Sequence, residues 1–214
     1  MYVMDKGLLT GVYLGGVHEK EGIIMEIEIK KLTPDMAEEY LQYFGHVAFT
    51  DHEEWANCYC LESHLSQEEN EKTFADKAVR RQKARELVQN GTMQGYLVYD
   101  GGAVVGWCNA ADKTSYEPIM AEEEFQTLPP KKGEIKVIYC FEFAPGYRGK
   151  GITHLLLDRI IQDSKEEGYS YIEAYPFLDT DFAWQYHGPI PLYEKHGFEQ
   201  IAEKSWFRIM QKKL

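Results

Sequence analysis

Short stretches in which apolar and polar residues alternate predict the strands of this chain. The alternation is clearest over residues 24–30, and residues 135–143 form a nearly continuous apolar run. Two apolar runs, 95–99 and 103–109, flank an Asp-Gly-Gly sequence, which predicts a β-hairpin. A further strand is predicted over residues 169–175, and two antiparallel strands, 198–203 and 206–211, are predicted to close the sheet.

Capping residues and helical spacing predict the helices. A Thr-Pro pair at residues 33–34 starts a helix that ends near residue 44. A capping box at residues 66–69 opens a long polar helix that ends near Gly91. Residues 151–167 carry apolar side chains at helical spacing, and residues 191–196 predict a short helix.

The whole pattern predicts one mixed α/β domain over residues 25–214, because no internal repeat or linker divides it. Residues 113–133 predict a long loop with one short helix. Residues 1–24 precede the first clear alternation and are interpreted as an N-terminal extension, either disordered or added by an upstream start codon. An intact-mass measurement on protein from its native source would test this boundary.

The composition argues against several classes of function. The net charge of −12 argues against nucleic-acid binding, and no apolar run is long enough to span a bilayer. The four cysteines lack C-x-x-C spacing, so neither a zinc knuckle nor a dithiol redox motif is predicted, and no metal site is expected. This cysteine usage favours a reducing cytoplasm.

The most informative stretch is the turn between the apolar run 135–143 and the helix 151–167. It reads Arg148-Gly149-Lys150-Gly151-Ile152, and a glycine-rich basic turn that opens a helix is typical of an anion site. A P-loop reads G-x-x-x-x-G-K-S/T, whereas here Gly146 and Gly149 are separated by only two residues. The G-x-G-x-x-G dinucleotide spacing also fails, so the anion is a phosphate or pyrophosphate of another ligand.

The turn resembles the acyl-CoA loop of the GNAT superfamily of N-acetyltransferases, Gln/Arg-x-x-Gly-x-Gly/Ala. It departs from that pattern only at Thr153, whose backbone N–H remains available. A second motif, Leu192-Tyr193 followed by Gly197-Phe198, is similar to the family's later Leu-Tyr-x-x-x-Gly-Phe. The resemblance covers residues 25–214 and implies a GNAT fold: an α/β (α+β) architecture with a central mixed, mostly antiparallel sheet flanked by helices.

The resemblance implies that acetyl-CoA is the co-substrate and that the turn holds its pyrophosphate through backbone N–H groups. It also implies that the strand before the turn pairs with the pantetheine arm, and that an N–H there polarises the thioester carbonyl. The implied CoA-binding residues are Phe141, Glu142, Phe143, Arg148, Gly149, Lys150, Gly151, Ile152 and Thr153.

Four residues are candidates for the proton transfers, one as the acid and three as the base. By resemblance, Tyr193 points at the CoA sulfur and acts as general acid. The general base is left open between Glu173, which some amine-acetylating members carry at this strand position, and Glu142. A carboxylate in an apolar strand has a raised pKa, which suits a base. His187, in a loop, is a third candidate.

The acceptor is predicted to be a small-molecule or peptide amine, and the aromatic stretch around Trp55, together with Trp107 and His187, is the candidate acceptor pocket. Two alternatives stay open at this point: a non-catalytic acyl-CoA-binding or sensing module on the same scaffold, and transfer of a longer acyl chain. The sequence fits a monomer or a homodimer.

Overall fold

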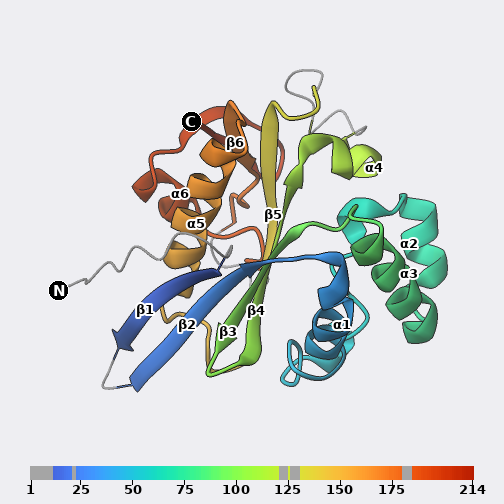
Figure 1. Cartoon of the computed structure of the whole chain (residues 1–214). Helices are drawn as coiled ribbons and strands as arrows, with labels where there is room; N and C mark the ends of the chain where they lie inside the picture. Colours follow the sequence, from blue (N-terminus) through green and yellow to red (C-terminus); the bar gives the residue numbers. More distant parts are fainter. Residues whose placement is uncertain (1–11, 21–22, 121–124, 126–130, 180–184) are drawn as a thin grey trace.

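A twisted sheet of eight strands runs through the described residues and separates two layers of helices (Figure 1). The computed structural model describes residues 12–20, 23–120, 125, 131–179 and 185–214. The strands lie in the order β1-β2-β3-β4-β5-β6-β8-β7, and all neighbours are antiparallel except β5 and β6. The predicted α/β (α+β) class, with a mixed and mostly antiparallel sheet flanked by helices, is confirmed.

The bounds of β2 to β8 lie close to the predicted ones, and β1 is a strand that the sequence analysis did not predict. They are β1 Val12–Lys20, β2 Ile23–Lys31, β3 Gly95–Asp100, β4 Ala103–Asp112, β5 Ile135–Phe143, β6 Tyr171–Ala174, β7 Glu199–Glu203 and β8 Arg208–Lys213. β1 lies inside the stretch interpreted as an N-terminal extension and pairs with β2. Residues 1–11 and 21–22 lie outside the described residues.

The helices are α1 Ala37–His46, α2 Gln67–Thr73, α3 Lys77–Gln89, α4 Glu117–Met120, α5 Ile152–Glu166 and α6 Ile190–Lys195. Short 3₁₀ turns are η1 Pro34–Met36, η2 Glu53–Trp55, η3 Glu62–His64 and η4 Lys113–Tyr116. The loop predicted over residues 113–133 therefore begins with η4 and α4, and residues 121–124 and 126–130 lie outside the described residues.

The single long helix predicted over residues 66–90 is wrong, because the structure has two helices there. Ser66 caps α2 through a capping box with Glu69. The helix ends at Phe74, and Asp76 then caps α3 by accepting a hydrogen bond from the Val79 N–H at 3.0 Å. A second strong N-cap inside the stretch starts a new helix.

Two apolar cores lie on opposite faces of the sheet. On one face α1 and α3 pack against it, with Tyr40, Phe44 and Trp107 almost fully buried. On the other face α5 and α6 pack against it through residues such as Leu156 and Ile160. Each fully buried side chain of this size contributes about 1.5–3 kcal/mol. Figure 1 shows α1 to α4 on one side of the strands and α5 and α6 on the other.

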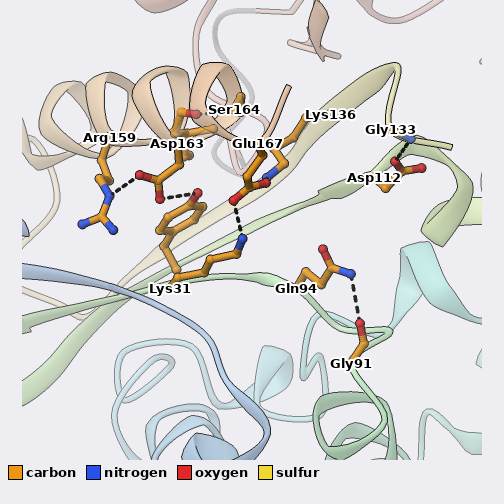
Figure 2. A network of polar contacts seen from close by, with 12 residues as sticks. Lys31, Gly91, Gln94, Asp112, Gly133, Lys136, Arg159, Asp163, Ser164 and Glu167 are labelled. Atoms are coloured by element: carbon orange, nitrogen blue, oxygen red, sulfur yellow. Dashed lines mark hydrogen bonds and ion pairs between the residues drawn. The ribbon is translucent and has the colours of Figure 1, made fainter. Parts of the chain in front are cut away.

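Ionic contacts at one end of α5 fasten this helix to the sheet (Figure 2). Glu167, just after the helix, accepts from Lys31 of β2 and from Lys136 of β5, the latter at 2.5 Å. Asp163 pairs with Arg159 at 2.7 Å and accepts from the Tyr96 hydroxyl at 3.0 Å. These contacts fix α5, and therefore the turn that precedes it, relative to β5.

Candidate active site

A β-bulge interrupts the pairing of β4 and β5. Asn109 of β4 pairs with Cys140, whereas the next residue, Ala110, pairs with Ile138. Tyr139 is therefore an extra residue on β5. Such bulges bend a strand and change which side chains face each side of the sheet.

The bulge decides where Glu142 points. Before it, Val137 and Tyr139 belong to the core on the α1 face; after it, Phe141 and Phe143 belong to the core on the α5 face. Residues two apart share a face, so the extra residue turns Glu142 to the α1 side of the sheet. The rings of Phe141 and Phe143 fill the core, and both residues also border a cleft.

β5 and β6 diverge beyond a short pairing. They are paired only from Ile135 to Ile138 on β5, and the segment 185–188 lies against β5 beyond that point. The Phe141 N–H donates to the Tyr186 carbonyl at 2.6 Å, and His187 Nδ1 is hydrogen-bonded to the Tyr139 carbonyl. The N–H expected to face a thioester therefore has a protein carbonyl as its partner in this structure.

The predicted anion turn lies between β5 and α5. Gly149 and Gly151 have φ of 70° and 83°, which only glycine adopts without strain. Gly151 is the N-cap of α5, and no side chain caps the helix. The first backbone N–H groups of α5, together with the helix dipole, make this end of the cleft suited to an anion.

Arg148 bridges the turn to carboxylates. Its Nη1 lies 2.5 Å from Asp51 Oδ2, and its Nη2 lies 3.3 Å from Glu142 Oε1. Its Nε donates to the Phe143 carbonyl at 2.9 Å. The sequence placed Arg148 among the CoA-binding residues, and the structure turns its guanidinium toward these carboxylates. The backbone of the turn is therefore the main candidate for binding a phosphate.

Glu142 has the properties of a base that works near neutral pH. Burial, assisted by the nearby Asp51 and opposed by Arg148, raises the pKa of Glu142 to about 7. Its side chain keeps 14% of its surface exposed and borders the cleft, so it is accessible to a bound molecule. A carboxylate that is half ionised near pH 7 is a candidate catalytic group.

A cleft of about 540 Å³ joins the turn to the α1 side of the sheet. It is bordered by β5, by the loop between α1 and α2, by the start of α5 and by the segment 185–189. Of the predicted site residues, it brings together Phe141, Glu142, Phe143, Arg148, Gly149, Thr153 and Trp55. Lys150, Gly151 and Ile152 belong to the same turn but do not line the cleft, and Ile152 is buried in the core below α5.

Tyr193 and His187 lie just behind the cleft wall. The Tyr193 hydroxyl donates to the His187 carbonyl at 2.5 Å, and burial raises the pKa of Tyr193 well above its ordinary value. Burial lowers the pKa of His187 to about 4, so its imidazole is neutral. Gly188 packs tightly between these elements, and a Cβ there would lie 3.3 Å from the Tyr193 hydroxyl oxygen.

Glu173 and Trp107 lie outside the cleft. The Glu173 carboxylate is completely buried and accepts from Lys113 at 2.7 Å, Tyr175 at 2.9 Å and Gln211 at 3.0 Å. Trp107 is fully buried between the sheet and α1, edge-on to Tyr40. The structure thus separates Glu173 from Glu142 and the turn, whereas Trp107 pairs with Glu142 across β4 and β5 but does not line the cleft.

Several cleft residues escaped the sequence analysis. The loop between α1 and α2 contributes Cys58, Cys60 and Ser63, and Phe74 and Tyr186 complete the wall. The density of aromatic residues over 49–64 was the available signal, and it identified the loop through Trp55. That signal did not identify the cysteines of the loop, because their spacing matches no known motif.

The comparison with known families agrees with this geometry. The model of the Acetyltransferase (GNAT) family matches residues 53–198, which include β5, the turn, α5 and Tyr193. The chain belongs to the GNAT acetyltransferase family. The match also spans residues 55–74, which we call the cleft loop, so most cleft-lining residues of this GNAT chain lie within the family region, and Phe49 and His52 precede it.

Solved GNAT structures share the fold at low sequence identity. The PaiA N-acetyltransferase of Thermoplasma acidophilum, solved with coenzyme A, is 16% identical, with a TM-score of 0.53 over 89% of this chain and 100% of that one. The GNAT domain of S. lividans PAT is 13% identical, with a TM-score of 0.53 over 91% and 93% of the two chains. A search of curated proteins found no match. Among the described residues of this GNAT chain, no helix has the length and apolarity to cross a membrane.

Proposed function

We propose that this chain is an N-acetyltransferase that moves the acetyl group of acetyl-CoA to a primary amine by direct attack in a ternary complex. The observation that carries the proposal is the cleft that joins the start of α5 to Glu142. One end suits the phosphates of a CoA thioester, and the other holds a carboxylate with a pKa of about 7. Acylation of an amine needs the bound thioester and the base within the same cleft.

The donor half is assigned to β5 and the turn. Backbone N–H groups of Gly149, Gly151 and Thr153 are proposed to hold the pyrophosphate, with Lys150 on the same turn. The acyl arm is proposed to lie along β5, with the Phe141 N–H polarising the thioester carbonyl. This requires the Tyr186 carbonyl to leave that N–H when the donor binds.

The acceptor half is assigned to the loop between α1 and α2. Phe49, Trp55, Phe74 and Tyr186 make this wall aromatic, and Glu62 adds a carboxylate. Such a surface suits an amine carried on an apolar or aromatic body, because the ring faces attract cations and bury apolar groups. The net charge of −12 favours the approach of a cation.

Proton transfer is assigned to Glu142 and Tyr193. Glu142 is proposed to take the proton of the attacking amine, directly or through a water. Tyr193 is proposed to donate a hydrogen bond to the leaving CoA sulfur. Because a phenol is a weaker acid than a thiol, hydrogen bonding rather than complete proton transfer is expected.

The Glu142→Gln variant is expected to lose about 10²-fold in kcat/KM, the usual contribution of a general base. In the wild type, kcat/KM should rise with pH through about 7, because only the ionised carboxylate accepts a proton. The variant should lack this rise. Rates measured between pH 5.5 and 9 would check it, and a variant that keeps the rise would exclude Glu142 as the base.

The activity itself is tested by thiol release from acetyl-CoA across a panel of arylalkylamines, polyamines, amino acids and peptide N-termini. We expect release with at least one apolar amine, and calorimetric binding of acetyl-CoA without amine. One observation favours a non-catalytic acyl-CoA-binding module instead: the Tyr186 and His187 carbonyls already hold the Phe141 N–H and the Tyr193 hydroxyl. Binding without release on any amine would support the module.

A further inference from the structure

Cys60 lies at a sharply turned position of the cleft loop. Tyr59 and Cys60 have φ of 44° and 49°, in the left-handed region that non-glycine residues rarely adopt. The turn is held from both sides, because the Tyr40 hydroxyl donates to the Tyr59 carbonyl at 2.7 Å and Arg80 donates to the Cys58 carbonyl at 2.9 Å. The Cys60 side chain is thereby fixed against β4 and β5.

The amide of Asn109 is directed at the Cys60 sulfur. Asn109 Oδ1 accepts from the Tyr116 hydroxyl at 2.7 Å, and Nδ2 lies 3.2 Å from His64 Nε2 and 3.2 Å from Cys60 Sγ. Burial lowers the pKa of His64 to about 4, and its Nδ1 is bonded to the Ser115 carbonyl, so Nε2 accepts a hydrogen. These partners leave one orientation for the amide, with its NH₂ directed at the Cys60 sulfur and at His64, and with Ser63 Oγ at 3.4 Å and Met93 Sδ at 3.8 Å as further acceptors.

A second thiol approaches the same sulfur from β5. Cys140, placed on the cleft face by the bulge, pairs with Asn109 across β4 and β5, so it lies beside the amide that contacts the Cys60 sulfur. The indole N–H of Trp107 lies near this sulfur without the geometry of a hydrogen bond. Both thiols border the cleft, whereas Cys108 is buried on the other face of the sheet.

The two thiols differ in acidity, and Cys60 is the more acidic one. Burial raises the pKa of Cys60, but the neighbouring Cys140 thiol, the Trp107 indole and the Asn109 amide together lower it, so the pKa lies below its ordinary value. The neighbouring Cys60 thiol, together with burial, raises the pKa of Cys140. One sulfur is thus the better thiolate and the other stays protonated beside it.

We propose that Cys60 is a nucleophilic thiol that reacts with small hydroperoxides entering the cleft, and that Cys140 converts the product to a Cys60–Cys140 disulfide. The Cys60 thiolate attacks one peroxide oxygen, the O–O bond breaks, and the other oxygen leaves and takes a proton as water or alcohol. Cys60 is oxidised to the sulfenic acid. The Cys140 sulfur then attacks Cys60, the S–O bond breaks, and the hydroxide leaves with the Cys140 proton as water.

The disulfide would tie the cleft loop to β5 two residues before Glu142. A dithiol reductant reverses it. The thiol chemistry stands whether or not the chain acetylates amines, so its failure is distinguishable from failure of the proposed function.

The test uses the full chain, reduced and then exposed to a small excess of hydrogen peroxide, with peptide mapping after free thiols are blocked. We expect one disulfide, linking Cys60 to Cys140, with Cys58 and Cys108 still free. The Cys140→Ser variant should stop at a Cys60 sulfenic acid that dimedone traps, and Cys60→Ser should give no trapped adduct. Cys58→Ser is the matched control from the same loop and should still form the disulfide.

A second measurement tests the role of the amide. Asn109→Ala should slow alkylation of Cys60 by iodoacetamide at pH 7 about tenfold, the effect of one pKa unit on the thiolate fraction. Circular dichroism would establish that each variant is folded. The proposal is overturned if peroxide leaves all four thiols free, or if Cys58 is the first thiol to react in the wild type.

Discussion

The Tyr193→Phe variant is expected to lose about 10³-fold in kcat for acetyl transfer, while its affinity for acetyl-CoA changes little. The reason is that only the hydroxyl is removed, and in the proposed mechanism that hydroxyl acts on the CoA sulfur as it leaves. The variant keeps the ring that packs against Phe198 in the core. Steady-state rates and calorimetric titration with acetyl-CoA would measure the two quantities separately.

The pH dependence adds a second criterion for Tyr193. Burial keeps the pKa of Tyr193 well above its ordinary value, so the hydroxyl stays protonated and no limb of the rate profile should belong to it. Tyr193→Phe should therefore lower the whole profile without changing its shape. Turnover equal to the wild type would remove Tyr193 from the mechanism.

A matched control separates chemistry from stability. Tyr193→Phe leaves the His187 carbonyl without its hydroxyl donor, at a cost of about 1–3 kcal/mol in the free energy of unfolding. Tyr175 is equally buried, and its hydroxyl donates to Glu173 outside the cleft. Tyr175→Phe should show a similar loss of stability with little loss of kcat.

The Glu173→Gln variant is expected to lose about 3 kcal/mol in the free energy of unfolding, the usual cost of removing one partner of a buried ion pair. Lys113 and Glu173 are both almost completely buried, so the variant removes the carboxylate that pairs with a buried ammonium group. Urea denaturation followed by tryptophan fluorescence would measure the loss. The pH profile of the folded variant should match that of the wild type, since Glu142 is the proposed base.

A double variant distinguishes the ion pair from general damage at this position. Adding Lys113→Met to Glu173→Gln removes the buried ammonium group that Glu173 paired with, so more than half of the lost stability should return. No recovery would mean that the hydrogen bonds to Tyr175 and Gln211, rather than the ion pair, are what Glu173 supplies. If the Glu173→Gln variant lacks the rise of kcat/KM near pH 7, Glu173 becomes the candidate general base again.

The order of the strands from β2 onward was predictable because each of them carries its own local signal, whereas β1 lies in the stretch interpreted as an extension. The apolar run of β5 and the helical spacing of α5 gave bounds within a residue or two of the observed ones. The helix predicted over residues 66–90 failed because the periodicity continues through Asp76, whose side chain caps a new helix. Local patterns predict where helical residues lie, but a capping residue inside such a stretch can divide it into two helices.

The candidate site was predictable only where a motif is continuous in the sequence. The turn and Glu142 lie within a few residues of each other, so the same resemblance located both. The surroundings of Glu173 were not predictable, because Lys113 and Gln211 reach it from distant strands and turns. Without those partners, a carboxylate in an apolar strand is indistinguishable from a base.

The cleft loop was the least predictable part. Its cysteines lie in an irregular stretch, and Cys140 comes from β5, eighty residues later than Cys60. The pair exists only because the left-handed turn at Tyr59 and the bulge at Tyr139 bring the two segments together. Neither feature has a sequence signature strong enough to predict it.

The bulge of β5 also bears on how this chain should be aligned with distant relatives. Two strands can match in length and still be out of phase, because one extra residue reverses which positions lie on a given face. At identities near 16%, a gap-free match of β5 to a strand without this bulge would assign Phe141 and Phe143 to the face that Glu142 occupies in this chain. Residues before and after Tyr139 therefore need to be matched as two separate segments, with the direction of each side chain as the guide.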